Sequence, residues 1–228
     1  MQTITAATAR QFNPAAVMMR GTATMPRRPT AEDGVRRNFS KGEELYAEGD
    51  AAEFFYKVVS GTVRICKVLN DGRRQIEAFH LAGDLFGLEH GSEHRFAAEA
   101  VDDLVVVVYR GRHLEGLVRD NPDLGGQLMS SVLASLDRAR DHMVLLGRKS
   151  AREKIASFLL DIAARLADGD RFDLPMQRAD IADHLGLTIE TVSRTLTQMA
   201  RDGLIKLAAC GRTVVLNNRD QLEALEAA

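Results

Sequence analysis

The stretch RADIADHLGLTIETVSRTLTQMA, residues 178–200, contains two short amphipathic helical patterns joined at Gly186. The apolar residues of the first pattern share one helical face: Ile181, Ala182 and Leu185. Glycine permits the sharp turn that follows. Thr188 stands where an N-cap hydroxyl would accept a hydrogen bond from the free amides of a second helix. The stretch therefore predicts a helix-turn-helix.

The second pattern starts at Ile189 and separates apolar from polar residues. Its apolar positions follow i, i+4 and i+7 spacing: Val192, Leu196 and Met199. The opposite face carries polar residues: Glu190, Ser193, Arg194 and Thr197. These are residue types that contact bases, because an arginine fork matches guanine O6 and N7, a carboxylate accepts from cytosine N4, and serine can contact either partner. The pattern favours a DNA-contacting helix.

The same pattern has a second interpretation. Amphipathic helix pairs joined by glycine also occur in all-helical domains that bind no nucleic acid. Glu190 and Arg194 are spaced i, i+4 in the favourable order, so they could simply form a surface pair worth about 0.2–0.5 kcal/mol. Spacing alone leaves both interpretations open.

The composition is that of a soluble globular protein, with 228 residues of which 45% are hydrophobic and 27% charged. This length predicts two compact units with a connecting element. The longest strongly apolar run, residues 104–109, is too short to cross a membrane, and the N-terminus lacks a secretion signal. Two cysteines, Cys66 and Cys210, are too few for a disulfide framework. We therefore expect a cytoplasmic protein with no membrane contact.

Charge alone gives little support for a nucleic-acid partner, because the net charge is only −2. Basic residues gather in the C-terminal part: Arg178, Arg194, Arg201, Lys206 and Arg212. Acidic residues lie among them: Asp180, Asp183, Glu190 and Asp202. The electrostatic argument for DNA binding from sequence is therefore weak.

The N-terminal half changes character twice. Residues 1–34 show no sustained period and predict a mobile arm. Residues 35–121 contain short β-type runs punctuated by glycine, with Asn70-Asp71-Gly72 a strong turn signal. The expected strands are residues 54–59, 62–69, 75–80, 96–100 and 104–109. A β-roll, that is a small barrel or jelly roll, follows.

A long helix is predicted for residues 122–147, beginning at Pro122. Apolar residues within it alternate three- and four-residue spacing, as in the seam of a coiled coil: Met129, Val132, Leu136, Ala139, Met143 and Leu146. The seam favours a parallel homodimer. A single helix packed on its own barrel remains the alternative, because three heptads are near the minimum for a coiled-coil assignment.

Residues 148–228 are expected to form a winged helix-turn-helix. A helix over residues 151–167 precedes the two helices already described, and Asp202-Gly203 ends the last of them. Residues 204–207 and 213–216 predict a hairpin turning at Cys210-Gly211. Lys206 and Arg212 on this wing could clamp phosphates beside the groove.

The order of β-roll, long helix and winged helix-turn-helix resembles the Crp/Fnr superfamily of bacterial transcription regulators, over about residues 35–220. The most specific piece is Glu190-x-x-Ser193-Arg194, which is similar to the E-x-x-S-R core of the Fnr and FixK branches. GDLFG at residues 83–87 is similar to the glycine-bounded turn of the family's β-roll. The resemblance implies an α+β fold, a cyclic-nucleotide-binding-like jelly roll, and a homodimer.

The resemblance also implies roles for individual residues. Glu190, Ser193 and Arg194 would contact bases of an inverted TTGAT-type half-site. The residues that would contact or position the DNA backbone are Arg178, Thr188, Thr191, Lys206 and Arg212. The implied partners are double-stranded DNA, RNA polymerase and a second copy of the chain. The implied activity is activation of low-oxygen or nitrogen-fixation genes.

Departures from the family pattern indicate which small-molecule or redox signals the protein could sense. Residues 1–34 contain no cysteine for an iron–sulfur centre. His94-Arg95-Phe96 stands where cyclic-nucleotide binders carry an Arg-Ser pair. The FixK-like branch therefore fits best, and we expect no cofactor and no cyclic nucleotide. A cyclic-nucleotide-responsive regulator, or a redox-responsive one that uses Cys210 at the wing tip, is the alternative.

Other chemistry-bearing residues fall into no site. His90 and His94 have i, i+4 spacing, but Gly91 and Ser92 between them predict a solvated loop rather than a metal-binding helix. Cys66, inside an expected strand, is interpreted as a small buried apolar residue. No nucleophile elbow, phosphate loop or zinc-ligand pair is present, so we expect neither an enzyme nor a metal site.

Overall fold

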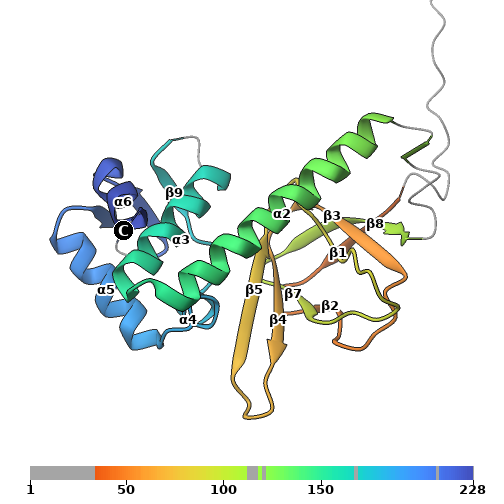
Figure 1. The fold of residues 1–228 in the computed structure, drawn as a ribbon, viewed down its shortest axis with the longest axis horizontal. Coiled ribbons are helices and arrows are strands. Elements are labelled where there is room, and N and C mark those ends of the chain that lie inside the picture. The colour runs from red at the N-terminus through yellow and green to blue at the C-terminus, as the bar shows by residue number, and fades with distance from the viewer. Residues whose placement is uncertain (1–33, 112–117, 120–121, 167–168, 209–210, 228) are drawn as a thin grey trace, which may run out of the picture.

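The computed structural model describes residues 34–111, 118–119, 122–166, 169–208 and 211–227. A β-roll, the long helix α2 (Pro122–Arg148) and a winged helical unit follow one another along the chain. α2 runs diagonally from the outer side of the β-roll to the winged unit, so it touches both (Figure 1). The predicted arm, residues 1–34, lies outside the described residues except for Gly34.

The β-roll consists of two four-stranded antiparallel sheets, with strand orders β1-β8-β3-β6 and β2-β7-β4-β5. The strands are β1 Val35–Phe39, β2 Glu44–Tyr46, β3 Phe54–Ser60, β4 Val63–Val68, β5 Arg74–His80, β6 Leu85–Phe86, β7 Ala97–Ala100 and β8 Leu104–Arg110. All five strands expected from the sequence are present. β1, β2 and β6 were not individually predicted.

Aromatic rings and aliphatic side chains fill the space between the two sheets. Tyr56 and Phe86 stack with ring centroids 5.1 Å apart, and Tyr46 packs against Tyr56 at 5.6 Å. The rest of this core is aliphatic: Val58, Val63, Ile65, Ala98, Ala100, Leu104 and Val106. Alternate positions of the strands point into this space, which is why each short apolar run forms a strand.

His94 corrects one expectation. The loop that carries it was predicted to be solvated, and His90 is indeed exposed. His94 is buried, however, and its ring stacks on Tyr46 with centroids 3.6 Å apart. An imidazole offers an apolar face as well as polar atoms, so the aromatic core of the β-roll accommodates it.

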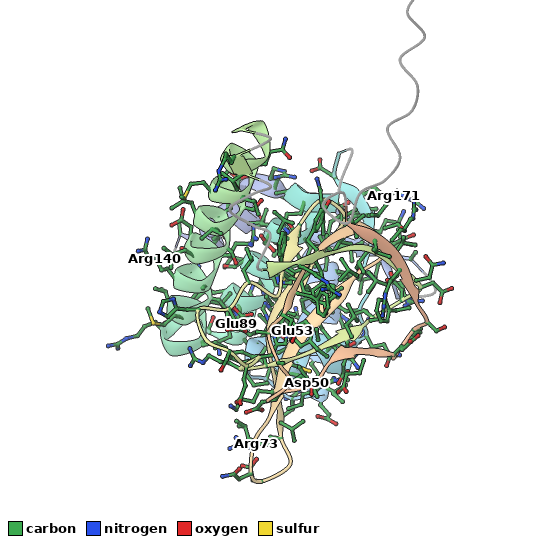
Figure 2. The ribbon with its side chains drawn as sticks, turned by 90° about the vertical axis from the view of Figure 1, so that its right-hand side faces the viewer. Asp50, Glu53, Arg73, Glu89, Arg140 and Arg171 are labelled. Atoms are coloured by element: carbon green, nitrogen blue, oxygen red, sulfur yellow. The ribbon has the colours of Figure 1, made fainter. Side chains whose placement is uncertain are left out.

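The β4–β5 hairpin turns where the sequence predicts. The amide of Gly72 donates to the carbonyl oxygen of Leu69 over 2.9 Å, which closes a tight turn. Gly72 has φ of +83°, a left-handed conformation that residues with a Cβ adopt at a cost. Arg73 lies in this turn, at the free end of the hairpin (Figure 2).

α2 packs through one face and leaves another exposed. Leu128 and Leu145 are buried, whereas apolar residues along a second face are open to solvent: Met129, Val132, Leu133, Leu136, Met143 and Val144. Of the expected seam, Ala139 is also exposed, and Leu146 is half-buried against the core of the winged unit. Arg140 points outward from the helix (Figure 2).

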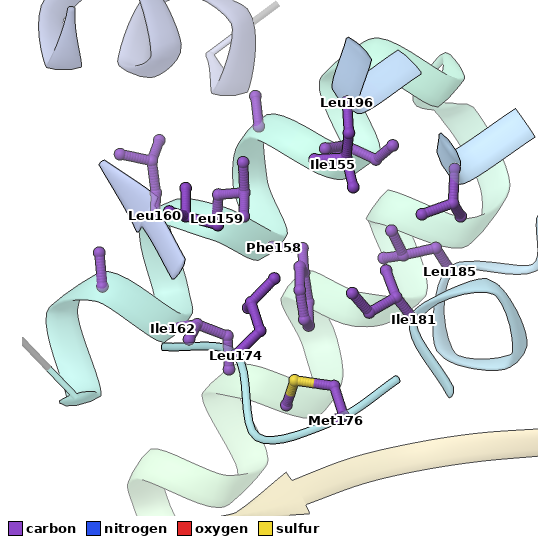
Figure 3. Close-up of a cluster of buried hydrophobic side chains, with 14 of the residues drawn as sticks. Ile155, Phe158, Leu159, Leu160, Ile162, Leu174, Met176, Ile181, Leu185 and Leu196 are labelled. Carbon is purple, nitrogen blue, oxygen red and sulfur yellow. The ribbon is translucent and has the colours of Figure 1, made fainter. Parts of the chain in front are cut away.

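The winged unit contains α3 Ala151–Leu166, β9 Arg171–Asp173, α4 Arg178–Leu185, α5 Ile189–Arg201, β10 Ile205–Leu207, β11 Thr213–Leu216 and α6 Arg219–Glu226. Its sheet has the order β10-β11-β9. α3 lies at the centre, where Ile155, Phe158 and Leu159 meet side chains from α4 and α5 (Figure 3). The same apolar cluster continues into the β-roll through Ile76 and Phe79 of β5.

Two further findings concern the described part of the chain. No helix in it is long and apolar enough to cross a bilayer. Cys66 is buried, as expected, and burial raises the pKa of its thiol to about 11, which keeps it protonated and unreactive.

Candidate nucleic-acid interface

α4 begins and ends through defined backbone contacts. At its start the amide of Gln177 donates to the Asp180 carboxylate over 3.1 Å, half of a capping box. At its end Gly186 adopts φ of +62°, and the amide of Leu187 donates to the carbonyl oxygen of Ala182. This left-handed residue turns the chain sharply into α5.

Thr188 is the N-cap of α5, as predicted. It has extended backbone angles, and its hydroxyl oxygen accepts a hydrogen bond from the amide of Thr191 over 3.2 Å. The two threonine hydroxyls also lie 3.1 Å apart. One free amide at the start of α5 is therefore satisfied, which fixes where the helix starts.

The two faces of α5 differ as the sequence predicts. Val192, Leu196 and Met199 are buried against the core. On the opposite face Glu190, Arg194 and Thr197 are exposed and Ser193 is half-buried. The Thr197 hydroxyl donates to the carbonyl oxygen of Ser193 over 2.8 Å, so it is partly occupied. Glu190, Ser193 and Arg194 are the polar side chains of this face that remain accessible to a partner.

The surface pair between Glu190 and Arg194 that the spacing allows is not formed. Within the described residues no ion pair joins these two side chains. The pKa of Glu190 is instead lowered mainly by a hydrogen bond from its own backbone amide, then by one from Thr188, with a smaller effect from the charge of Arg194. The helix start holds the carboxylate, and the guanidinium of Arg194 is exposed without an ion pair to Glu190.

Three cationic side chains lie on the wing or beside it. Lys206 on β10 and Arg212 before β11 are exposed, and Arg212 donates to the carbonyl oxygen of Pro175 over 3.2 Å. A Cβ placed on Gly211 would lie 3.4 Å from Nη2 of Arg178, so this guanidinium lies over the wing backbone. Cys210 lies outside the described residues.

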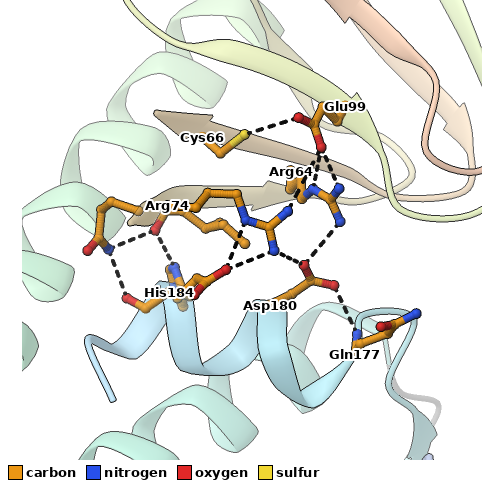
Figure 4. Close-up of polar contacts among 10 residues, drawn as sticks. Arg64, Cys66, Arg74, Glu99, Gln177, Asp180 and His184 are labelled. Carbon is orange, nitrogen blue, oxygen red and sulfur yellow. Dashed lines mark hydrogen bonds and ion pairs between the residues drawn. The ribbon is translucent and has the colours of Figure 1, made fainter. Parts of the chain in front are cut away.

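Three of the four acidic residues around the interface form ion pairs within the protein. Asp180 and Asp183 on α4 pair with Arg64 and Arg74 of the β-roll (Figure 4). Asp202 accepts from Arg152 over 2.5 Å, and this contact, followed by one from Gln198, lowers its pKa. Of the acidic residues seen in the sequence, Asp180, Asp183 and Asp202 are therefore paired with arginines, whereas Glu190 stays exposed beside the exposed bases.

Sequence reasoning missed two features of the interface. Ile189, the first residue of α5, is 49% exposed, although an apolar residue there would be expected to pack inward. An exposed aliphatic side chain at this position is suited to contact the methyl group of thymine. Arg64 and Arg74 were not singled out, because nothing local in a strand signals a contact with a helix over 100 residues away.

A cavity of about 670 Å³ lies between β5, α2 and α3, within the size range of small-molecule sites. Its lining mixes apolar rings with charged groups, among them Glu77, Arg138 and Arg165. No group of three side chains suited to a metal occurs in the parts of the chain that the structure describes. The cavity is therefore the feature of this region that a small molecule could occupy.

Comparison with known proteins agrees with this geometry. Residues 36–121 match the cyclic nucleotide-binding domain model, and residues 153–225 match the Crp-like helix-turn-helix domain model. The nitrogen fixation regulation protein FixK of Azorhizobium caulinodans is 44% identical over 92% of this chain and 88% of its own length. The protein of the same name from Rhizobium meliloti is 41% identical over 82% of this chain and 85% of its own.

A solved structure gives the same result. FixK2 from Bradyrhizobium japonicum superposes with a TM-score of 0.80 at 46% identity, covering 86% of this chain and 98% of its own. The matched region includes the β-roll as well as the winged unit, so the whole architecture is shared. The chain belongs to the Crp/Fnr family of DNA-binding transcription regulators, within its FixK-like branch.

Proposed function

We propose that this regulator acts as a homodimeric activator that binds two inverted TTGAT-type half-sites. The observation that carries the proposal is the exposed polar face of α5, formed by Glu190, Ser193 and Arg194 on a helix whose other face is fully buried. A helix held this firmly can enter a major groove without rearranging, with its N-terminal residues at the base edges.

Each exposed residue has a distinct proposed role. Arg194, free of an ion pair with Glu190, presents its fork to guanine, while the Glu190 carboxylate accepts from cytosine N4. Ser193 supplies a hydroxyl, and the wing bases Lys206 and Arg212 contact phosphates. Arg178, Thr188 and Thr191 fix the interface to the backbone of the duplex.

The dimer is proposed from α2. Six large apolar side chains along one face of this helix are exposed in the single chain, with exposed fractions of 45–68%. A second copy of α2 packed in parallel would cover them and place two α5 helices on opposite sides of a two-fold axis. Two inverted half-sites match that symmetry.

The gene targets and the RNA polymerase partner are proposed from the relatives. Curated proteins matching this chain are called nitrogen fixation regulation proteins, and others are called transcriptional activators. Activation of nitrogen-fixation or low-oxygen genes, through contact with RNA polymerase, is the corresponding role for this chain.

We also propose that the β-roll does not respond to cyclic nucleotides, although its family model is named for them. Of the residues standing at the phosphate-binding motif, His94 is packed on Tyr46 and Arg95 is exposed. Neither side chain is placed as a pair for one phosphate. Calorimetry with cyclic AMP should give no saturable heat, and micromolar binding would overturn this part of the proposal.

The DNA proposal is tested with the purified full-length protein. We expect a footprint covering two inverted TTGAT half-sites, with affinity at least about a thousandfold above that for a scrambled duplex at the same salt concentration. Equal affinity for both duplexes would contradict it. Repeating the footprint after peroxide treatment tests whether Cys210 controls binding.

A further inference from the structure

We propose that Arg64 and Arg74 of the β-roll are positioning residues for DNA recognition, acting through Asp180 and Asp183 of α4. This inference rests on the proposed binding of two half-sites by a dimer. Neither arginine approaches the recognition face of α5. Their contribution is to fix the direction in which the β-roll and the dimer helix hold that face.

The contacts are short and converge on one carboxylate. Nη1 of Arg64 lies 3.0 Å from Oδ1 of Asp180, and Nη2 of Arg74 lies 2.6 Å from the same oxygen. Arg74 also contacts Oδ2 of Asp183, from Nη2 at 2.8 Å and from Nε at 2.9 Å. Figure 4 shows the two guanidinium groups side by side above α4. The bidentate contact of Arg74 fixes direction as well as distance.

The arginines are themselves held in place. Glu99 of β7 accepts from Nε of Arg64 over 2.8 Å and also contacts Nη2 of the same guanidinium. The side chains of Arg64 and Asp180 are only 17% and 5% exposed. These groups therefore have little freedom to rearrange, and water screens their interaction weakly.

The C-terminal end of α4 is attached to β5, the strand that carries Arg74. Nε2 of Gln75 donates to the carbonyl oxygen of His184 over 3.3 Å. Nδ1 of His184 lies 3.1 Å from the carbonyl oxygen of Ile76. Contacts at both ends of an eight-residue helix resist rotation as well as translation, which a single ion pair would not do.

The contacts between α4 and the β-roll matter because the chain itself joins α2 to the winged unit through a link of only two residues. Only Lys149 and Ser150 separate α2 from α3. α4 packs directly on α5, so a fixed α4 fixes the recognition helix relative to the β-roll. In a dimer, two such helices must reach grooves about one helical turn apart at the same time.

Loss of the contacts between α4 and the β-roll should therefore change the ratio of paired-site to half-site affinity. A single half-site requires only an intact winged unit, whereas a paired site also requires the correct separation and orientation of two units. The ratio of paired-site to half-site affinity measures the benefit of simultaneous binding. In some proteins partly buried ion pairs contribute to geometric specificity although they add little to stability.

The test compares Arg74→Gln and Asp183→Asn with the control Arg73→Gln in the full-length protein. Arg73 is adjacent in the hairpin but 77% exposed, and it pairs with Asp71 in the same turn. Affinities are measured for three duplexes: a single half-site, the paired inverted site, and the paired site with about half a helical turn inserted between the half-sites.

We expect Arg74→Gln and Asp183→Asn each to lower the paired-site advantage by about tenfold and to reduce discrimination against the inserted spacer. Arg73→Gln should leave both unchanged. The double variant should be no worse than Arg74→Gln alone, because that change already removes the contact between Arg74 and Asp183. A general charge effect makes a different prediction: removing a base weakens binding and removing an acid strengthens it.

Opposite effects of Arg74→Gln and Asp183→Asn, or an unchanged paired-site advantage, would overturn the positioning role. A variant that loses half-site and paired-site binding equally leaves the advantage unchanged and counts against it too. Failure of the wild-type protein to distinguish cognate from scrambled DNA would instead contradict the proposed function. The two failures are therefore separable in one experiment.

Discussion

The imidazole ring of His142 on α2 stacks on that of His184 on α4, with centroids 4.1 Å apart and planes 12° apart. His184 also contacts the carbonyl oxygen of Ile76 on β5, so α2, the helix-turn-helix and the β-roll meet at this pair. Nε2 of His142 is buried and has no hydrogen-bond partner among the residues that the structure describes. A proton gained by either ring would place a charge in this contact.

The first prediction concerns pH. Burial, then the charge of His142, lowers the pKa of His184 from 6.5 to about 3, and burial followed by Lys154 lowers that of His142. Below pH 6.5 both histidines therefore bind protons in the unfolded chain but stay neutral in the native protein. The contribution of these two histidines to the free energy of unfolding is therefore fully present above pH 6.5. It declines as the pH falls toward 3, by at most about 1.4 kcal/mol per pH unit for each histidine.

Urea unfolding at pH 7.5, 6.5, 5.5 and 4.5 measures this decline, and His184→Gln should make the dependence shallower. His90→Gln, a substitution in an exposed loop, is the control and should leave the dependence as in the wild type. The same slope for His184→Gln and wild type would show that the stacked histidine pair does not drive the effect.

A second prediction concerns the exposed face of α2. Leu136, 45% exposed in the single chain, lies in the middle of the proposed dimer contact. Leu136→Asp should shift the dimer toward monomer in sedimentation velocity, because a carboxylate would be buried without a partner. Ala134→Asp, an exposed position outside the apolar stripe, should remain dimeric. A dimeric Leu136→Asp would mean that the subunits meet elsewhere.

A third prediction is that substitutions of Arg194 and Arg212 affect DNA affinity in different ways. Arg194→Ala should cost about 1–3 kcal/mol at the cognate site and relax discrimination at guanine, since it removes a base contact. Arg212→Ala should weaken cognate and scrambled duplexes alike and lower the salt dependence of binding. Fluorescence anisotropy on both duplexes at several salt concentrations measures this. If Arg194→Ala lost equal affinity for both, its role at bases would be excluded.

The N-cap of α5 gives a prediction for stability. Thr188→Ala removes the hydroxyl that accepts from the amide of Thr191, and should lower the free energy of unfolding by about 1 kcal/mol. Thr197→Ala on the same helix removes an exposed hydroxyl that bonds only to the preceding turn, so it should change stability by less than about 0.5 kcal/mol. Urea midpoints decide between them, and equal effects would mean that the cap contributes nothing specific.

Local pattern predicted much of this structure from the sequence. The bounds of α4 and α5 follow from Gly186, Thr188 and the apolar spacing, and the long helix ends at Arg148, one residue beyond the expected end. These features depend on contacts a few residues apart, which a periodic sequence records directly. The polar face of α5 was predictable for the same reason.

Other elements were missed because their local signals are weak. β6 has only two residues, β9 buries Phe172 alone, and the polar helix α6 buries Leu222 alone. Such elements form because neighbours already in place supply their partners.

The pairing of Asp180 with Arg64 and Arg74 depends on residues over 100 positions apart. In the sequence these charges look like ordinary surface charges, and only the fold identifies them as partners.

The origin of the cations that neutralise α4 also affects protein engineering. Because strands β4 and β5 supply them, a winged unit transplanted onto a foreign β-roll would carry Asp180 and Asp183 without counter-charges. A functional chimera between relatives would then need the hairpin residues 63–80 transferred together with residues 151–227. The natural exchangeable module is therefore discontinuous in sequence.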